Sequence, residues 1–224
     1  EHVGEQEFDS MVRSNMQILL NLFHENSSRL EDVRNDISSS LSNTDVAGVN
    51  DILENIASLN KSIKNSQILG NPALELQDQR NDLIDQLASY LPITVKYRDE
   101  EVGPGQFVEV LDVHFTASDG STYTLISDSD FGHLDTGITD GLASLSITDA
   151  SGNSFAGMED LLGNGTLKGM FDILNKSGEF DKPASTIKGL GYYETSLNSL
   201  VKTFAEKFNE MNKAPDGTAQ IGRA

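Results

Sequence analysis

The chain has 224 residues, no cysteine and a formal net charge of −19. This charge argues against binding to nucleic acid or to an anionic membrane, because phosphate contacts need a patch of Lys and Arg. The lack of cysteine excludes a disulfide framework, thiolate metal sites and a cysteine nucleophile. No apolar run approaches the ~20 residues of a membrane-spanning helix, and the sequence shows no signal-peptide pattern.

Residues 8–41 have the pattern of a long helix with one apolar stripe. Ser, Thr, Asn and Asp crowd residues 38–45, and such residues favour helix caps over helix interiors. Gly48 adds to the cost of a continuous helix, so the sequence favours a break near 42–45, with Thr44 or Asp45 as N-cap, over one very long helix. The stripe consists of Phe8, Val12, Leu19, Leu22, Leu30, Val33 and Ile37.

Residues 46–91 have the pattern of two helices joined at a short corner. Gly70 suits the left-handed position that ends a helix, and Pro72 suits the start of the next one. Apolar residues recur at steps of three and four, which is the seam of a helix packing lengthwise on others. The seam comprises Val49, Ile52, Ile56, Leu59 and Ile63 in the first helix, and Leu76, Leu83, Leu87 and Leu91 in the second.

After Pro92 the apolar residues recur at every second position, which indicates strands over 93–97, 107–115, 123–126 and 142–148. Residues 118–121 and 149–153 have hairpin-turn composition. Residues 127–141 are expected to form an acidic loop. This β region, 93–157, is expected to form one short sheet or a partial barrel.

A short helix is expected over 167–174 and a final helix over 187–211, whose apolar stripe is the cleanest in the chain. We therefore predict an α+β fold. It is an elongated antiparallel helical bundle, with the first and last helices packed together, and a small β region inserted between the third and the C-terminal helices. The predicted domains are a discontinuous bundle of 1–92 and 158–213, the β region of 93–157, and a disordered tail of 214–224. The final stripe comprises Leu190, Tyr193, Leu197, Leu200, Phe204, Phe208 and Met211.

No pattern of catalytic or metal-binding residues stands out, so we predict no enzyme, no metal and no cofactor. The four histidines, His2, His24, His114 and His133, have no metal-ligand spacing. A calcium loop starting at Asp149 would place Asp160 at its twelfth position, which matches the calcium pattern only in part. Asp78, Arg80 and Asp82 are compatible with a local ion-pair cluster or a subunit contact, although their spacing favours a solvated helix face.

The helical hairpin resembles the family of flagellar hook-associated protein 1, which joins hook and filament in bacterial flagella. The resemblance rests on IASLNKSI at 56–63, GNPA at 70–73 and LQDQRNDLI at 76–84, and extends over roughly 8–212. Asn81 stands where the family usually has Asp. The residues that match the family motif, which we expect to be structural, are Ile56, Leu59, Asn60, Gly70, Asn71, Pro72, Leu76, Asp78, Gln79, Arg80, Leu83 and Leu87.

The resemblance implies a structural component of the flagellum that forms the junction by subunit packing. It also implies export through the type III channel without a cleaved signal, and an extracellular location. The expected partners are other copies of the protein, the hook protein, the next junction protein and an export chaperone. Because the chain starts at Glu1 and lacks the terminal coiled helices that the resemblance implies, we expect a central fragment that is monomeric. The alternative is a surface or phage-tail binding module that uses the β region, with calcium dependence.

Overall fold

A computed structural model describes residues 2–211; the side chains of residues 2–6, 8, 9 and 211 are outside this description. Helices and antiparallel sheets are combined in one chain, which confirms the α+β fold class. The chain divides into two compact units. The described part of unit 1 is 2–35 and 176–211, and unit 2 is 36–175. The expected disordered tail, 214–224, lies outside the described residues.

The helix through Ser42 to Asp45 is not broken, which corrects the prediction. Helix α1 (His2–Ser40) runs into a π-helical turn, η1 (Leu41–Val46), and then into α2 (Ala47–Ile68). Leu41 and Val46 are buried, and their burial outweighs the weak helix propensity of the residues between them. Two of the polar side chains are also hydrogen-bonded: the Ser42 hydroxyl lies 2.9 Å from that of Thr136, and Asp45 accepts from the Ser40 hydroxyl at 3.2 Å.

The corner between α2 and α3 (Leu74–Tyr90) is closed by two backbone hydrogen bonds, as its sequence predicts. The N–H of Asn71 donates to the Ser66 carbonyl and that of Gly70 donates to the Gln67 carbonyl, both at 2.9 Å. Gly70 has φ 81°, so the corner is a Schellman motif with glycine in its left-handed position. Helix α3 begins two residues later than Pro72.

The β region contains two antiparallel sheets, not one. Sheet A has the order β1 (Ile93–Gly103), β2 (Gln106–Thr116), β3 (Thr122–Ser127) and β4 (Asp130–Phe131). Sheet B has the order β5 (His133–Thr139), β6 (Leu142–Thr148) and β7 (Ser154–Ala156). The predicted acidic loop of 127–141 is therefore wrong. Strand β5 escaped the sequence pattern because Leu134 is its single buried residue.

Two asparagines from helices complete the hydrogen bonding of sheet B. The amide of Asn50 in α2 donates to the Leu134 carbonyl at 2.9 Å and accepts from its N–H at 2.8 Å. Asn175, at the end of α4 (Thr166–Asn175), makes the same pair of bonds with Ala143 at 2.7 Å each. Each side chain replaces the backbone of a missing strand, which protects strand edges that are otherwise prone to mispairing.

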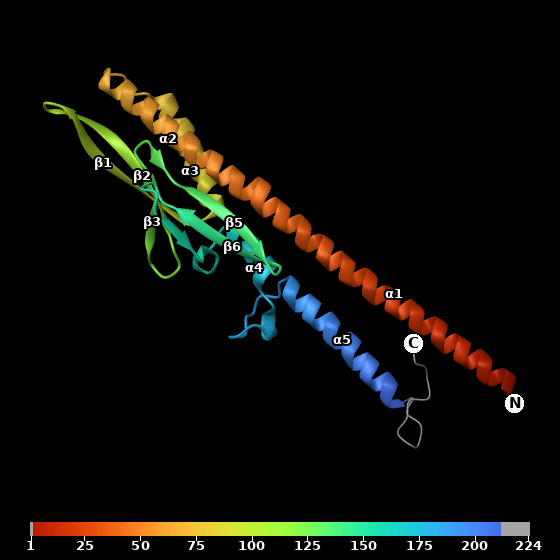
Figure 1. Ribbon diagram of the computed structural model, residues 1–224. Coiled ribbons are helices and arrows are strands. Elements are labelled where there is room, and N and C mark those ends of the chain that lie inside the picture. Colours follow the sequence, from red (N-terminus) through yellow and green to blue (C-terminus); the bar gives the residue numbers. More distant parts are fainter. Residues whose placement is uncertain (1, 212–224) are drawn as a thin grey trace. The chain divides into compact units, whose positions relative to one another are not determined.

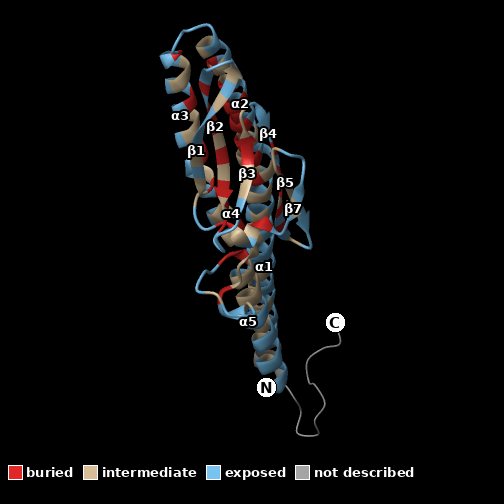
Figure 2. Cartoon of the chain, turned by 90° about the vertical axis from the view of Figure 1, so that its left-hand side faces the viewer, coloured by how far each residue is buried: buried red, intermediate tan, exposed pale blue. Residues whose placement is uncertain are grey.

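The core of unit 2 lies between its helices and both sheets (Figure 2). Fully buried side chains come from α2, α3 and α4, from β2 and β3 of sheet A, and from β5 and β6 of sheet B. The predicted domain boundaries at 92/93 and 157/158 therefore do not coincide with those of the compact units, because the strands share one core with α2. The largest of these buried side chains are Phe115, Phe171, Leu53, Ile56, Ile63, Leu111, Leu125, Ile126 and Leu134.

In unit 1 the first part of α1 packs against α5 (Leu190–Met211). The short helix η3 (Gly178–Phe180) precedes α5 in the chain. The rings of Phe23 and Phe204 lie 6.4 Å apart, and Arg34 contacts Glu194 at 2.8 Å. This order of contacts makes the pair antiparallel, which confirms that the first and last helices pack together. The final stripe is less buried than we predict from its sequence, since Leu200 is 57% exposed. The side chains of Phe8 and Met211 lie outside the description.

Candidate functional site: a polar junction between the helical hairpin and sheet A

The family-motif residues fall into three groups in the structure. The apolar group holds α2 and α3 together: Ile56 and Leu87 are fully buried, and Leu59, Leu76 and Leu83 are half-buried. The corner residues Gly70, Asn71 and Pro72, together with Asp78 and Gln79, are exposed. The third group is Asn60 and Arg80, which are the buried polar or charged residues of the described part, each 3% exposed.

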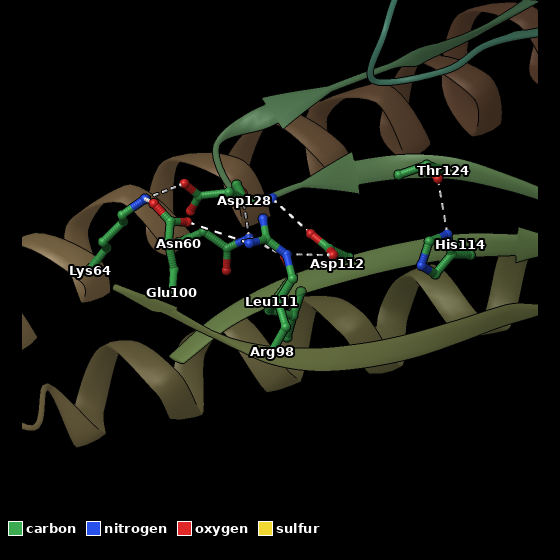
Figure 3. Close-up of polar contacts among 9 residues, drawn as sticks. All are labelled: Asn60, Lys64, Arg98, Glu100, Leu111, Asp112, His114, Thr124 and Asp128. Carbon is green, nitrogen blue, oxygen red and sulfur yellow. Dashed lines mark hydrogen bonds and ion pairs between the residues drawn. The ribbon is translucent and has the colours of Figure 1, made fainter. Parts of the chain in front are cut away.

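Asn60 and Arg80 tie both helices of the hairpin to sheet A. The Arg80 Nη1 donates to the Asn60 Oδ1 at 3.0 Å. The Asn60 Nδ2 in turn donates to the Leu111 carbonyl of β2 at 3.3 Å and to the Asp128 carbonyl at 2.6 Å (Figure 3). One side-chain amide thus joins α3, β2 and the turn after β3, and fixes how the hairpin lies on the sheet.

The Arg80 guanidinium carries a buried charge. Burial lowers its pKa, and the nearby Tyr97 and Glu109 partly offset this effect. Its carbon Cζ lies 5.8 Å from the centre of the Tyr97 ring, a distance at which a cation is attracted to the ring face. An arginine keeps its charge in proteins, so replacing its partners would leave that charge uncompensated inside the fold.

Five charged side chains and one backbone N–H lie around Asn60 (Figure 3). Lys64 of α2 contacts the Asp128 carboxylate at 2.6 Å and the Glu100 carboxylate at 3.0 Å. Arg98 contacts Asp112 at 3.0 Å, and Asp112 also accepts from the N–H of Asp128 at 3.1 Å. The hydrogen bond to Asp128 raises the pKa of Lys64, and the hydrogen bond from Lys64 lowers the pKa of Glu100. These contacts lock the αL turn at Asp128, whose φ is 56°.

The candidate metal residues serve other purposes in the structure. The Asp149 carboxylate accepts from the N–H groups of Ser151 and Asn153 at 2.9 Å, so it closes the β6–β7 turn. These bonds and the side chain of Asn153, which has the largest effect, lower the pKa of Asp149. His114 lies 3.1 Å from the Thr124 hydroxyl, and burial lowers its pKa. Within the described residues no three His, Cys, Asp or Glu side chains gather where they could hold a metal ion.

The prediction of a solvated face at Asp78, Arg80 and Asp82 is half right. Asp78 and Asp82 are exposed, but Arg80 is buried and points to Asn60. The signal was present in the sequence, because Arg80 falls on the apolar seam between Leu76 and Leu83. A polar residue on such a seam typically fixes the register in which the helices pack against each other. The ring of Lys64, Glu100, Arg98, Asp112 and Asp128 has no local signal, because its members come together only when the sheet forms.

Fold and site together define a structural α+β domain, in which a helical hairpin is fastened to a sheet by a buried polar junction. Among helices of the described part, none is long and apolar enough to span a membrane. The chain belongs to the family of the flagellar hook-associated protein FlgK helical domain, whose model matches residues 5–222. This match confirms the resemblance seen in the hairpin sequence.

Two relatives place the chain within that family. It is 27% identical over 226 residues to flagellar hook-associated protein 1 of Bacillus subtilis (strain 168), covering 95% of this chain and 42% of the relative. Its fold is similar to that of the flagellar hook junction protein FlgK from Burkholderia pseudomallei, with a TM-score of 0.59 and 18% identity. That similarity covers 84% of this chain and 30% of the other. The chain therefore spans less than half the length of the curated relative.

Proposed function

We propose that this chain is a structural part of the junction between the hook and the filament of a bacterial flagellum, and that it acts by subunit packing. The observation that carries the proposal is the family match over 5–222, combined with the structural use of the motif residues. Asn60 and Arg80 connect the hairpin to sheet A from inside the fold, and Gly70, Asn71 and Pro72 form its exposed corner. A domain that must keep its shape under mechanical load benefits from such internal fastening.

We propose that the protein is not an enzyme. The polar clusters of the described part are engaged in ion pairs and in hydrogen bonds to the backbone, and a structural flagellar family gives no precedent for catalysis. The alternative, a surface or phage-tail binding module with calcium dependence, receives no support from the comparisons.

The proposed partners are other copies of the protein, the hook protein, the next junction protein and an export chaperone. The proposed location is the extracellular flagellum, reached through the type III export channel without a cleaved signal. The lack of cysteine is compatible with passage through a narrow channel as an unfolded chain. The charge of −19 leads us to propose that the isolated chain is a monomer, because like-charged copies repel at moderate salt. Light scattering coupled to size exclusion tests this; a discrete, concentration-independent oligomer contradicts it.

Deleting the gene that encodes this chain tests the main proposal. We expect cells with hooks but without attached filaments in electron micrographs, and filaments released into the medium. Reintroducing the intact gene should restore attached filaments. Normal attached filaments in the deletion strain would contradict a junction role.

A further inference from the structure

Two turns of unit 2 lie at the same end of the unit: the α2–α3 corner and the β1–β2 turn (Figure 1). They are joined directly, because the Gln106 side chain donates to the Ile68 carbonyl at 3.1 Å. Each turn is also closed by itself. The corner is a Schellman motif, and in the β1–β2 turn the Glu101 carboxylate accepts from the N–H of Gly105 at 3.0 Å. This end of unit 2 is therefore held in shape before any partner arrives.

Four large apolar side chains at this end are open to solvent. Leu69 is 86% exposed, Leu74 is 64% exposed, Phe107 is 61% exposed and Ile68 is 40% exposed. We call these four residues the corner patch. None of them belongs to the core. Single exposed apolar residues are normal on protein surfaces, but several together on two adjoining rigid turns are typical of an interaction site.

The two segments that carry the corner patch are acidic and contain no basic residue. Segments 65–79 and 99–109 have no Lys or Arg. Glu100 is paired with Lys64 and Arg98, whereas the other acidic side chains of the two segments are exposed. An apolar centre with a rim of one charge sign selects a partner of the opposite sign. The acidic residues of the two segments are Glu75, Asp78, Asp99, Glu100, Glu101 and Glu109.

We propose that the corner patch is a docking surface for a protein segment that presents apolar side chains flanked by Lys and Arg. A second copy of this chain is a poor occupant, because its own patch carries the same acidic rim. An anionic membrane is repelled for the same reason. The closed turns favour tight binding, because little conformational entropy is lost when a rigid surface is covered. The inference rests on this surface alone and is independent of the proposed junction role.

A titration with synthetic peptides tests the proposal. The probe is a fluorescein-labelled amphipathic helix of Leu and Lys, and its binding to the whole chain is followed by fluorescence anisotropy. The test variant combines Leu69→Ser in the corner, Leu74→Ser at the start of α3 and Phe107→Thr in β2, where Thr suits a strand. We expect the variant to bind the probe roughly tenfold more weakly or worse, since it loses most of the apolar contact.

A matched control replaces exposed apolar residues elsewhere in unit 2. Ile138→Thr with Leu142→Ser removes side chains that are 45% and 54% exposed at the β5–β6 turn, and should leave the affinity unchanged. A peptide with Glu in place of Lys should not bind. Equal losses in both variants, equal binding of the Leu/Glu peptide, or self-association through the patch in sedimentation would each overturn the proposal. Circular dichroism checks folding. If the triple variant unfolds, Leu69→Ser alone serves as the test, with a smaller but measurable loss expected.

Discussion

The two compact units use similar helical stripes with different results. Leu190 is the only buried apolar side chain described in unit 1, and all the others lie within residues 41–174 of unit 2. The stripe of α2 is covered by α3 and by both sheets. The stripe of α5 contacts α1 through side chains such as Phe204. A groove of about 450 Å³ along the α1–α5 pair is lined by Val33, Tyr193, Leu197 and Leu200.

This difference shows that a regular apolar stripe predicts a helix and its contact face, but not the depth of burial. Two helices cover only the seam between them, so residues on either side of the seam stay open. In unit 2 the sheets close those sides. The stability of the chain should therefore depend much more on unit 2, and several changes can test how strong this contrast is.

The largest effect is expected from deleting residues 102–157 and bridging the gap with a flexible linker. If the sheets only decorated the helices, a helical and cooperatively melting protein would remain. The structure leads to the opposite expectation, because the deletion removes the buried strand residues that cover α2, among them Val113 and Phe115. Thermal melting followed by circular dichroism should lose its cooperative transition for unit 2; a sharp transition that persists would show that α2 and α3 need no sheet.

The next largest effect on stability is expected when one phenylalanine in each unit is replaced and the two costs are compared. Phe115 is fully buried and stacks on Tyr123 with ring centres 5.9 Å apart, so Phe115→Ala should lower the free energy of unfolding by about 3–5 kcal/mol. Phe204 is only half-buried, so Phe204→Ala should cost about 1 kcal/mol. Urea denaturation measures both. Equal costs would remove the contrast between the units.

A smaller effect is expected at the polar junction. Asn60→Ala leaves the Arg80 charge buried without its amide partner, which should cost about 2–4 kcal/mol in urea denaturation. Arg80→Met removes the charge but keeps much of the volume, so its cost should be lower. The double variant should cost less than the sum of the two single changes, because the residues are coupled. Additive costs would mean that Asn60 and Arg80 act independently.

The smallest expected effect is on the pH dependence of folding stability. Burial and the nearby Lys96 lower the pKa of His114 below its ordinary value of 6.5, while Asp112 acts in the opposite direction. The unfolded chain therefore takes up a proton at higher pH than the folded chain does, and stability falls as the pH drops below about 6.5. His114→Gln should flatten this slope between pH 7 and 5, and His133→Gln, at an exposed position, should not. An unchanged slope in His114→Gln would exclude His114 as its source.

Much of the fold could be predicted from local sequence. The hairpin, its glycine corner, the final helix and most of sheet A follow from periodicity and turn chemistry. The π-helical turn at 41–46 could not be predicted from local sequence. Its polar residues favour a helix end, and the helix continues because Leu41 and Val46 are buried. Strand β5 was missed because Leu134 is its single buried residue, so its sequence shows no alternation of apolar and polar residues.

The candidate site was predictable only in part. The family motif included Asn60 and Arg80, but the spacing of Asp78, Arg80 and Asp82 predicted a solvated face for Arg80, which is buried. The hydrogen bond between Asn60 and Arg80 depends on how α2 and α3 face each other, and the bonds to Leu111 and Asp128 depend on the sheet. Sequence patterns indicate which residues share one face of a helix or strand. The hydrogen bonds between residues distant in sequence can be identified only from the three-dimensional structure.

Native-state hydrogen exchange tests the contrast between the units most directly. It measures the free energy of opening at each backbone amide without any mutation. We predict slow exchange, close to the global limit, for amides in α2, β2 and β6, and exchange that is faster by at least tenfold along α5 from Leu197 to Phe208. Uniform protection across α2 and α5 would contradict the account, because it would place the α1–α5 pair in the same cooperative core as unit 2.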